Sequence, residues 1–242
     1  MKSEILSNRE LRIFKHQIDL PYIGIQGQEK LKRSSVLIVG AGGKGTFTLQ
    51  NLAVAGIGSI GICDYQVVEE TAISRQTLYG SGDLGKQKAI ISKQKLTENN
   101  PFCIIEIHNI CLSESNISNI IADYDIIVDT TDNYASHRLI DNAALQLKIP
   151  VVFGILHKGI IMVTVFHFRN GHSLQQIFPY DPQYHGDNVL SALLPGEIIP
   201  YGLTGSLLAN EVLKVILDFP GVLDGKILNF DISTYRITID PL

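Results

Sequence analysis

The sequence predicts an α/β fold with a Rossmann-like, doubly wound, mostly parallel sheet that continues into antiparallel strands. Short apolar strands alternate with helical segments as far as Phe153, which is the pattern of parallel strands joined by crossover helices. A glycine-rich turn follows the first strand, as in nucleotide-binding sheets. Beyond residue 160, β-branched segments are separated by turns, which favours antiparallel pairing. We expect residues 1–242 to form a single domain.

Composition excludes several classes of function. Hydrophobic residues make up 45% of the chain and charged residues 18%, as expected for a sheet covered on both faces. The net charge of −4 gives no general attraction to nucleic acid or to anionic membranes. No signal peptide or membrane span is predicted, and Cys63, Cys103 and Cys111 form no CxxC pair, so we expect a reducing, cytoplasmic location.

The elements of the first half follow from apolar periodicity and from turn signals. Residues 1–34 contain two short amphipathic helices, and the Asn-Asn-Pro sequence at 99–101 ends a later helix. Polar and turn-forming residues make 65–82 a functional loop. The expected helices are 9–20, 26–34, 46–55, 86–98, 115–121 and 137–147, and the expected strands are 36–39, 59–63, 104–107, 125–128 and 151–153.

The second half departs from a plain dehydrogenase domain, which would repeat the parallel unit. We expect a strand at 160–168 followed by a hairpin-type turn at 169–172, then an irregular stretch at 173–200. A long apolar helix at 201–217 and a closing hairpin of strands 226–230 and 235–239 complete the chain.

The glycine turn predicts a nucleotide site. Gly40, Gly42 and Gly45 fit G-x-G-x-x-G: the first glycine permits the tight turn, the second lets backbone approach a phosphate, and the third lets the helix pack on the strand. The N-terminus of that helix then faces the anion. Asp64 follows the second strand, where a carboxylate accepts a hydrogen bond from a ribose hydroxyl. This motif does not choose between NAD, FAD and ATP.

Two further clusters narrow the choice. Arg75 and Lys88 lie shortly after Asp64, and two cations there suit a triphosphate, although a solvated charged loop would have the same composition. Asp132 follows a buried strand, at the edge where open α/β sheets bind ligands. It could hold Mg²⁺ on a phosphate, or it could be the N-cap of the next helix.

With these motifs the chain resembles the ubiquitin-activating-enzyme superfamily, of the ThiF/MoeB/HesA adenylyltransferase type, from about residue 13 to the end. The matching segments are Gln17–Ile18, the glycine turn, Asp64, Ser74–Gln76, Gly85–Lys88, Thr131–Asn133, Pro200, Gly205–Leu207, Glu211, Lys214, Gly225–Lys226 and Asp231.

The resemblance implies that ATP and Mg²⁺ activate the C-terminal carboxylate of a small ubiquitin-like or sulfur-carrier protein, or of a peptide, with release of pyrophosphate. It also implies a homodimer and a crossover loop at 173–200 that clamps the substrate tail. The implied nucleotide-binding residues are Gly40, Gly42, Gly43, Gly45, Asp64, Arg75, Lys88 and His16, where His16 stands in place of an arginine that reaches the partner subunit's ATP. The implied catalytic residues are Arg75, Lys88 and Asp132, with Asp132 the ligand of Mg²⁺.

The chain also departs from this family. Ser173 and Gln176 occupy the place of the first zinc-binding cysteine pair, so no zinc is expected. Ala192 replaces the crossover-loop cysteine, so no thioester or persulfide step is expected. Ala72 replaces an asparagine that precedes the loop arginine. Lys44 replaces an aliphatic residue of the glycine turn, where it could touch a phosphate or point to solvent, and we expect it to point to solvent.

Two alternatives stay open from the sequence. A non-catalytic, nucleotide-binding partner subunit would account for the altered His16 and Ala72. A dinucleotide oxidoreductase would account for the glycine turn and Asp64, but not for Arg75, Lys88 and Asp132 together.

Overall fold

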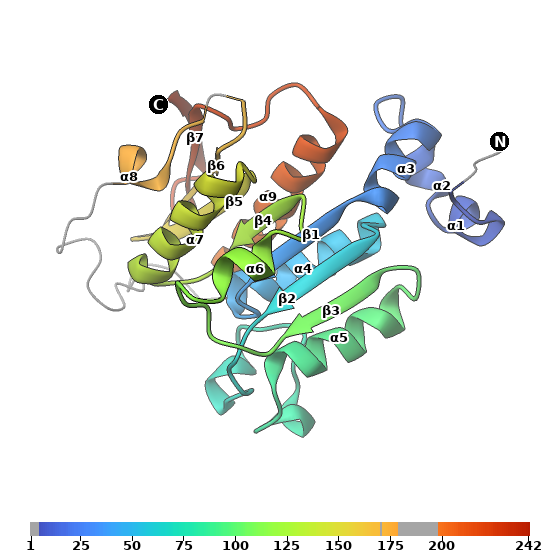
Figure 1. The fold of residues 1–242 in the computed structure, drawn as a ribbon, viewed down its shortest axis with the longest axis horizontal. Coiled ribbons are helices and arrows are strands. Elements are labelled where there is room, and N and C mark those ends of the chain that lie inside the picture. Colours follow the sequence, from blue (N-terminus) through green and yellow to red (C-terminus); the bar gives the residue numbers. More distant parts are fainter. Residues whose placement is uncertain (1–4, 170, 179–197) are drawn as a thin grey trace.

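The computed structural model describes residues 5–169, 171–178 and 198–242 (Figure 1). Eight strands form one sheet in the order β3-β2-β1-β4-β5-β6-β7-β8. The strands are β1 Ser35–Val39, β2 Ser59–Cys63, β3 Ile104–His108, β4 Ile126–Asp129, β5 Val151–His157, β6 Ile160–Phe166, β7 Lys226–Asp231 and β8 Arg236–Pro241. The predicted Rossmann-like sheet is confirmed by this strand order.

The first five strands pair in parallel. β1 lies between β2 and β4, with Val36 opposite Ile60 on one side and Ile126 on the other. The chain winds outward through β2 and β3, then returns past β1 to β4 and β5. The carboxyl ends of β1 and β4 therefore meet where the strand order reverses, which is the position at which open α/β sheets bind ligands.

The antiparallel part begins at β6, as the sequence predicts. β5 runs on to His157 and pairs with β6 in antiparallel register. Lys158 and Gly159 make the turn between them with φ of 48° and 82°, as a two-residue hairpin requires. In the predicted hairpin-type turn at 169–172, residue 170 lies outside the described residues, and the next described element after β6 is helix α8, Leu174–Ile177, not a strand. The closing hairpin of β7 and β8 is confirmed.

Helices cover both faces of the sheet (Figure 1). Helices α4 (Gly43–Ala55), α5 (Lys88–Asn99) and α9 (Ile198–Leu217) pack on one face, through a core that includes Leu49, Ile91 and Leu208. Helices α6 (Ile117–Ile121) and α7 (Tyr134–Leu147) cover the other face, through a core around Ile121, Ile140 and Phe153. Alternate residues of β1 face the two cores, which is the period of a strand buried on both sides.

The N-terminal helices lie at the end of the sheet where β1 begins (Figure 1). They are α1 Asn8–Ile13, α2 Lys15–Ile18 and α3 Gly24–Arg33, so the predicted helix at 9–20 is divided. Gln17 and Gln28 each donate a side-chain hydrogen bond to the carbonyl oxygen of Ala55, the last residue of α4, at 2.8 and 3.0 Å. The N-terminal segment is thereby fixed to the end of α4 remote from the glycine turn.

Two short 3-10 helices, η1 Glu70–Ala72 and η2 Ser81–Asp83, lie in the predicted loop at 65–82. In the described part of the chain, no helix combines the length and the apolar character needed to cross a bilayer. Most of the predicted crossover loop, including Ala192, lies outside the described residues.

Candidate nucleotide-binding site

The glycine turn joins β1 to α4 and leaves room for a ligand at one position. Gly40 has φ of 99°, a conformation that side-chain-bearing residues rarely adopt, and a methyl group at Gly45 would lie 1.9 Å from the carbonyl oxygen of Gly40. At Gly42 a methyl group would meet no atom within 4 Å. Gly42 is the N-cap of α4, so the open space lies at the positive end of a 13-residue helix.

Side chains from two neighbouring segments brace the turn. The buried Asp64 accepts hydrogen bonds from the backbone amides of Ala41 and Gln66, both at 2.7 Å. The hydroxyl of Tyr79 donates to the carbonyl oxygen of Ala41 at 2.9 Å and lies 2.9 Å from the Ser92 hydroxyl. Sequence reasoning missed Tyr79, because nothing in its local pattern distinguishes it from a core aromatic residue. The turn is therefore held in shape before any ligand binds.

Lys88 begins α5 and is buried, with its Nζ donating to Oε1 of Gln66 at 2.8 Å. Burial lowers the pKa of Lys88, while the charges of Asp64, Glu69 and Asp132 oppose that shift and the charge of Arg75 adds to it. Asp64, Arg75 and Asp132 thus lie near enough to Lys88 for their charges to act on its ammonium. The structure brings the four predicted charged residues into one neighbourhood.

Arg75 is half-buried and lies against Tyr201 of α9. Its Nη1 is 3.4 Å from the Tyr201 hydroxyl, and its guanidinium carbon lies 5.9 Å from the centre of the ring. The same ring lies against the glycine turn, because a methyl group at Gly43 would come within 2.7 Å of it. Gly43, which was predicted to contact the nucleotide, is therefore also a packing position for Tyr201. Tyr201 was not predicted as part of the site.

The Asp-Thr-Thr-Asp-Asn segment carries one buried and one exposed carboxylate. The N-cap of α7 is Asn133, whose Oδ1 accepts from the Ser136 amide at 2.9 Å, so the alternative that Asp132 caps this helix is wrong. Asp132 is exposed. Asp129 is buried and pairs with Nδ1 of His137 at 2.8 Å, while it accepts two hydrogen bonds from Thr131.

Asp129 is held in its charged form. Burial alone would raise its pKa, but the charge and hydrogen bond of His137, the Thr131 hydroxyl and the charge of Lys44 outweigh burial and lower it. Because the oxygens of Asp129 already accept these hydrogen bonds, Asp132 is the carboxylate of this segment that remains exposed for a ligand.

Lys44 corrects a prediction. Expected to point to solvent, it is buried, and its Nζ donates to the carbonyl oxygens of Thr131 at 2.7 Å and Gly154 at 2.9 Å. Its position on the first turn of α4 directs the long side chain between β4 and β5 rather than outward. Periodicity could not reveal this, since the acceptors are backbone atoms from distant segments.

Four other residues singled out in the sequence lie outside this cluster. His16 is exposed on α2, whose neighbour Gln17 binds the far end of α4, about 20 Å from the glycine turn at 1.5 Å per helical residue. Ala72 is buried in the apolar core. Ser173 and Gln176, at the expected place of a zinc-binding pair, form the capping box of α8 instead.

The donors around the turn fit a nucleoside triphosphate better than a closed metal centre. Open space at Gly42, a helix N-terminus and two cations offer hydrogen bonds and positive charge to phosphate oxygens. Within the described ranges, no group of three or more His, Cys, Asp or Glu residues could hold a metal ion by itself. The exposed carboxylate of Asp132 would be the protein group here that holds Mg²⁺, and the ion would supply positive charge to phosphate oxygens.

Fold and site together define a Rossmann-like nucleotide-binding protein whose charged residues are suited to phosphate chemistry. The model of the ThiF family matches residues 14–240, and the chain belongs to this family.

Relatives support this assignment, and a solved structure supports the fold. The chain is 38% identical over 224 residues to the "Probable molybdopterin-synthase adenylyltransferase" of Porphyra purpurea, covering 92% of this chain and 58% of the relative. It is 35% identical over 230 residues to the "Sulfur carrier protein adenylyltransferase" of Thermus thermophilus, covering 93% and 84%. Most of the matched relatives are longer, and the chain spans about half of their length. The crystal structure of E. coli MccB with ATP superposes with a TM-score of 0.79 at 21% identity, covering 100% of this chain and 73% of that one, which supports the fold.

Proposed function

We propose that this chain is an ATP-dependent adenylyltransferase. It activates the C-terminal carboxylate of a small ubiquitin-like or sulfur-carrier protein, or of a peptide. The observation that carries the proposal is the gathering of Asp64, Arg75, Lys88 and Asp132 around the glycine turn. The names of the relatives, which include adenylyltransferases of sulfur-carrier proteins, support the same reaction class.

In the proposed reaction, an oxygen of the substrate carboxylate attacks the α-phosphorus of ATP. The bond from the α-phosphorus to the bridging oxygen of the β-phosphate breaks, and pyrophosphate leaves with that electron pair. The acyl-adenylate remains, and no side-chain nucleophile is needed. The protein positions two anions against each other and screens their charge.

Each part of the site has a role in this proposal. The amides at the start of α4 and the space at Gly42 receive the phosphates, and Asp64 receives the ribose. Lys88 and Arg75 neutralise charge on the departing pyrophosphate. Mg²⁺, when bound, would screen the phosphate oxygens and make pyrophosphate a better leaving group. Asp132 would hold that ion, because its carboxylate is exposed and acts on Lys88 across the site.

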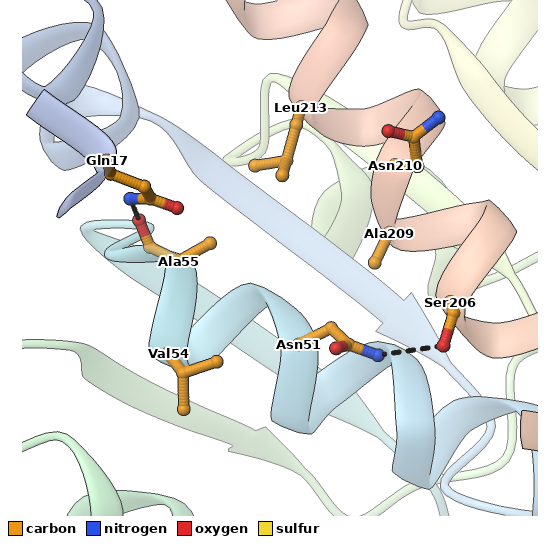
Figure 2. A pocket seen from close by; sticks show the side chains of 8 residues that line it. All are labelled: Gln17, Asn51, Val54, Ala55, Ser206, Ala209, Asn210 and Leu213. Atoms are coloured by element: carbon orange, nitrogen blue, oxygen red, sulfur yellow. Dashed lines mark hydrogen bonds between the residues drawn. The ribbon is translucent and has the colours of Figure 1, made fainter. Parts of the chain in front are cut away.

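A homodimer is part of the proposal. His16 lies too far from the glycine turn of its own chain to contact the phosphates, so it could serve only a partner subunit's site. Beside it, a groove of about 280 Å³ runs between α2, α4 and α9, and Figure 2 shows its polar side chains Gln17, Asn51, Ser206 and Asn210. Val54 in the same groove is 59% exposed, and a second copy of the chain would bury it. Light scattering should give twice the 26.7 kDa mass of one chain.

Isotope exchange tests the central claim. The chain is incubated with ATP, Mg²⁺, labelled pyrophosphate and candidate carriers or peptides, and label should enter ATP only when the correct carboxylate is present. Asp132→Ala should abolish this exchange without changing the circular dichroism or the melting temperature, since the side chain is exposed. If exchange persists in the variant, Asp132 has no role in the reaction; if no carrier supports exchange, the adenylyltransferase proposal fails.

A non-catalytic partner subunit is the second candidate. It is favoured by the exposed His16, because an imidazole cannot reproduce the bidentate hydrogen bonds of the guanidinium that it replaces. Calorimetry with ATP and Mg²⁺, together with the exchange assay, separates the two: a chain that binds ATP but supports no pyrophosphate exchange by itself would support this second candidate.

A further inference from the structure

Lys44 is a buried cation in the glycine turn for which the proposed reaction has no use. The residue is 6% exposed. Its ammonium donates hydrogen bonds to two backbone carbonyl oxygens and to no carboxylate. Burial of an ammonium is unfavourable unless its donors are satisfied. Lys44 therefore contributes hydrogen bonds to two backbone carbonyl oxygens that an apolar side chain could not make.

The two carbonyl acceptors lie on separate parts of the sheet. Thr131 belongs to the loop after β4 and immediately precedes Asp132, whereas Gly154 is in the middle of β5. Gly154 itself is fixed against α9, because a methyl group there would lie 2.9 Å from Cδ2 of Leu208. Lys44 thus joins a loop to a rigid strand and to the first turn of α4.

Two carboxylates lie near the Lys44 ammonium. Asp129 and Asp132 both act on the Lys44 ammonium and oppose the lowering of its pKa by burial. Asp129 is already engaged by His137 and Thr131. The carboxylate left for a ligand is that of Asp132, and the backbone just before it is held by Lys44.

We propose that Lys44 is a positioning residue that fixes the loop bearing Asp132 at the nucleotide site. The inference rests on the proposed function for its consequence in catalysis, but the anchoring itself is a property of the free protein. Two of the three ammonium donors are taken by carbonyl oxygens, so Lys44 acts through the loop and not as a phosphate ligand in the manner of Lys88.

Hydrogen exchange in the free protein tests the anchoring. In Lys44→Met, which keeps the length and removes the donors, the amides of residues 130–134 should exchange about tenfold faster, as expected for the loss of a hydrogen bond to a charged group. The Thr131 amide, which donates to Asp129 at 2.9 Å, is the natural reporter. Amides of β1 and β2 should keep their rates. Lys93→Met, the same change on the exposed face of α5, is the matched control.

ATP binding and exchange then test the consequence. Without Mg²⁺, Lys44→Met should bind ATP as the parent does, whereas with Mg²⁺ it should need about tenfold more of the ion for half-maximal pyrophosphate exchange. Weaker ATP binding without Mg²⁺ would make Lys44 a direct ligand and overturn the proposal. Unchanged amide rates at 130–134 would overturn it as well.

The failure of each idea is distinguishable. A parent protein without exchange activity contradicts the proposed function, and the hydrogen-exchange arm still decides the role of Lys44. If Lys44→Met does not fold, Lys44→Gln replaces it, because the amide keeps donors on a shorter side chain. The shorter side chain cannot bridge both carbonyl oxygens, so the amides of residues 130–134 should exchange faster in Lys44→Gln than in the parent. Parent-like rates would refute the anchoring.

Discussion

The two halves of the sheet treat polar groups differently. In the parallel half, β1, β2 and β4 are almost wholly buried, and charged side chains such as Asp64, Lys88 and Asp129 are buried at their carboxyl ends. In the antiparallel half, neither β7 nor β8 contains a buried residue, and Ile239 of β8 is 56% exposed. The central parallel strands have enough packing to hold charged groups away from water in fixed positions, and the terminal hairpin of β7 and β8 has not.

The largest loss of stability should come from a substitution in the glycine turn, where the parallel half leaves no space for a side chain at Gly45. Gly45→Ala places a methyl group 1.9 Å from a backbone oxygen and should cost about 3 kcal/mol or more of unfolding free energy. Gly42→Ala, in open space, should keep the stability of the parent and weaken ATP binding. Urea unfolding and calorimetry measure the pair; equal stability of the two variants would contradict the described turn.

Removal of a buried cation should come next. Lys88→Met should lower pyrophosphate exchange by a factor of about 10² to 10³, as observed when a single donor to developing charge is lost. Lys93→Met, five residues further along α5 and exposed, should leave the rate unchanged. Initial rates at saturating ATP decide this, and equal losses in both variants would show that Lys88 acts only through general charge.

The buried pair of Asp129 and His137 should make the free energy of unfolding depend on pH in the acidic range. Since folding lowers the pKa of Asp129, its contribution to stability is complete above the ordinary value of about 3.9 and is lost as the pH falls through the lower folded pKa. Asp129→Asn should therefore be less stable than the parent by about 2 kcal/mol near neutrality. That difference should shrink toward pH 3. Urea titrations across this range test the sign, and a constant difference would argue against a charged Asp129.

The smallest effect should come from the antiparallel edge. Ile239→Thr replaces an exposed β-branched residue with another and should change the free energy of unfolding by no more than about 0.5 kcal/mol. Exchange activity should be unaffected. A large loss in either measurement would mean that this edge is covered in the working assembly.

The sequence predicted most of the parallel half because its signals are local. β2 has the predicted bounds, because its apolar run lies between Gly58 and Asp64. α4 begins at Gly43 rather than Thr46, because glycines with low helix propensity form its first turn when packing holds them. The turn between β5 and β6 was missed, because its Lys-Gly pair lacks the usual asparagine or aspartate.

For the site, residue type and spacing indicated which charges would gather, but not how they are supported. Asp64, Arg75 and Lys88 lie between the end of β2 and the first residue of α5, and Asp132 follows β4. The strand order brings these two segments to one edge of the sheet. Lys44 and Tyr79 were missed because their partners are backbone carbonyls, which carry no mark in the sequence. Tyr201 was missed because its contact with Gly43 spans more than 150 positions of chain.

The contact between Tyr201 and Gly43 couples two positions that are distant in the sequence. The Tyr201 ring fills the space that a side chain at position 43 would take. The guanidinium of Arg75 lies against the same ring. A substitution at Tyr201, near the start of α9, therefore also alters the packing at Gly43 and the position of Arg75. Changes at 201 and 43 should therefore be selected jointly in a library rather than combined afterwards.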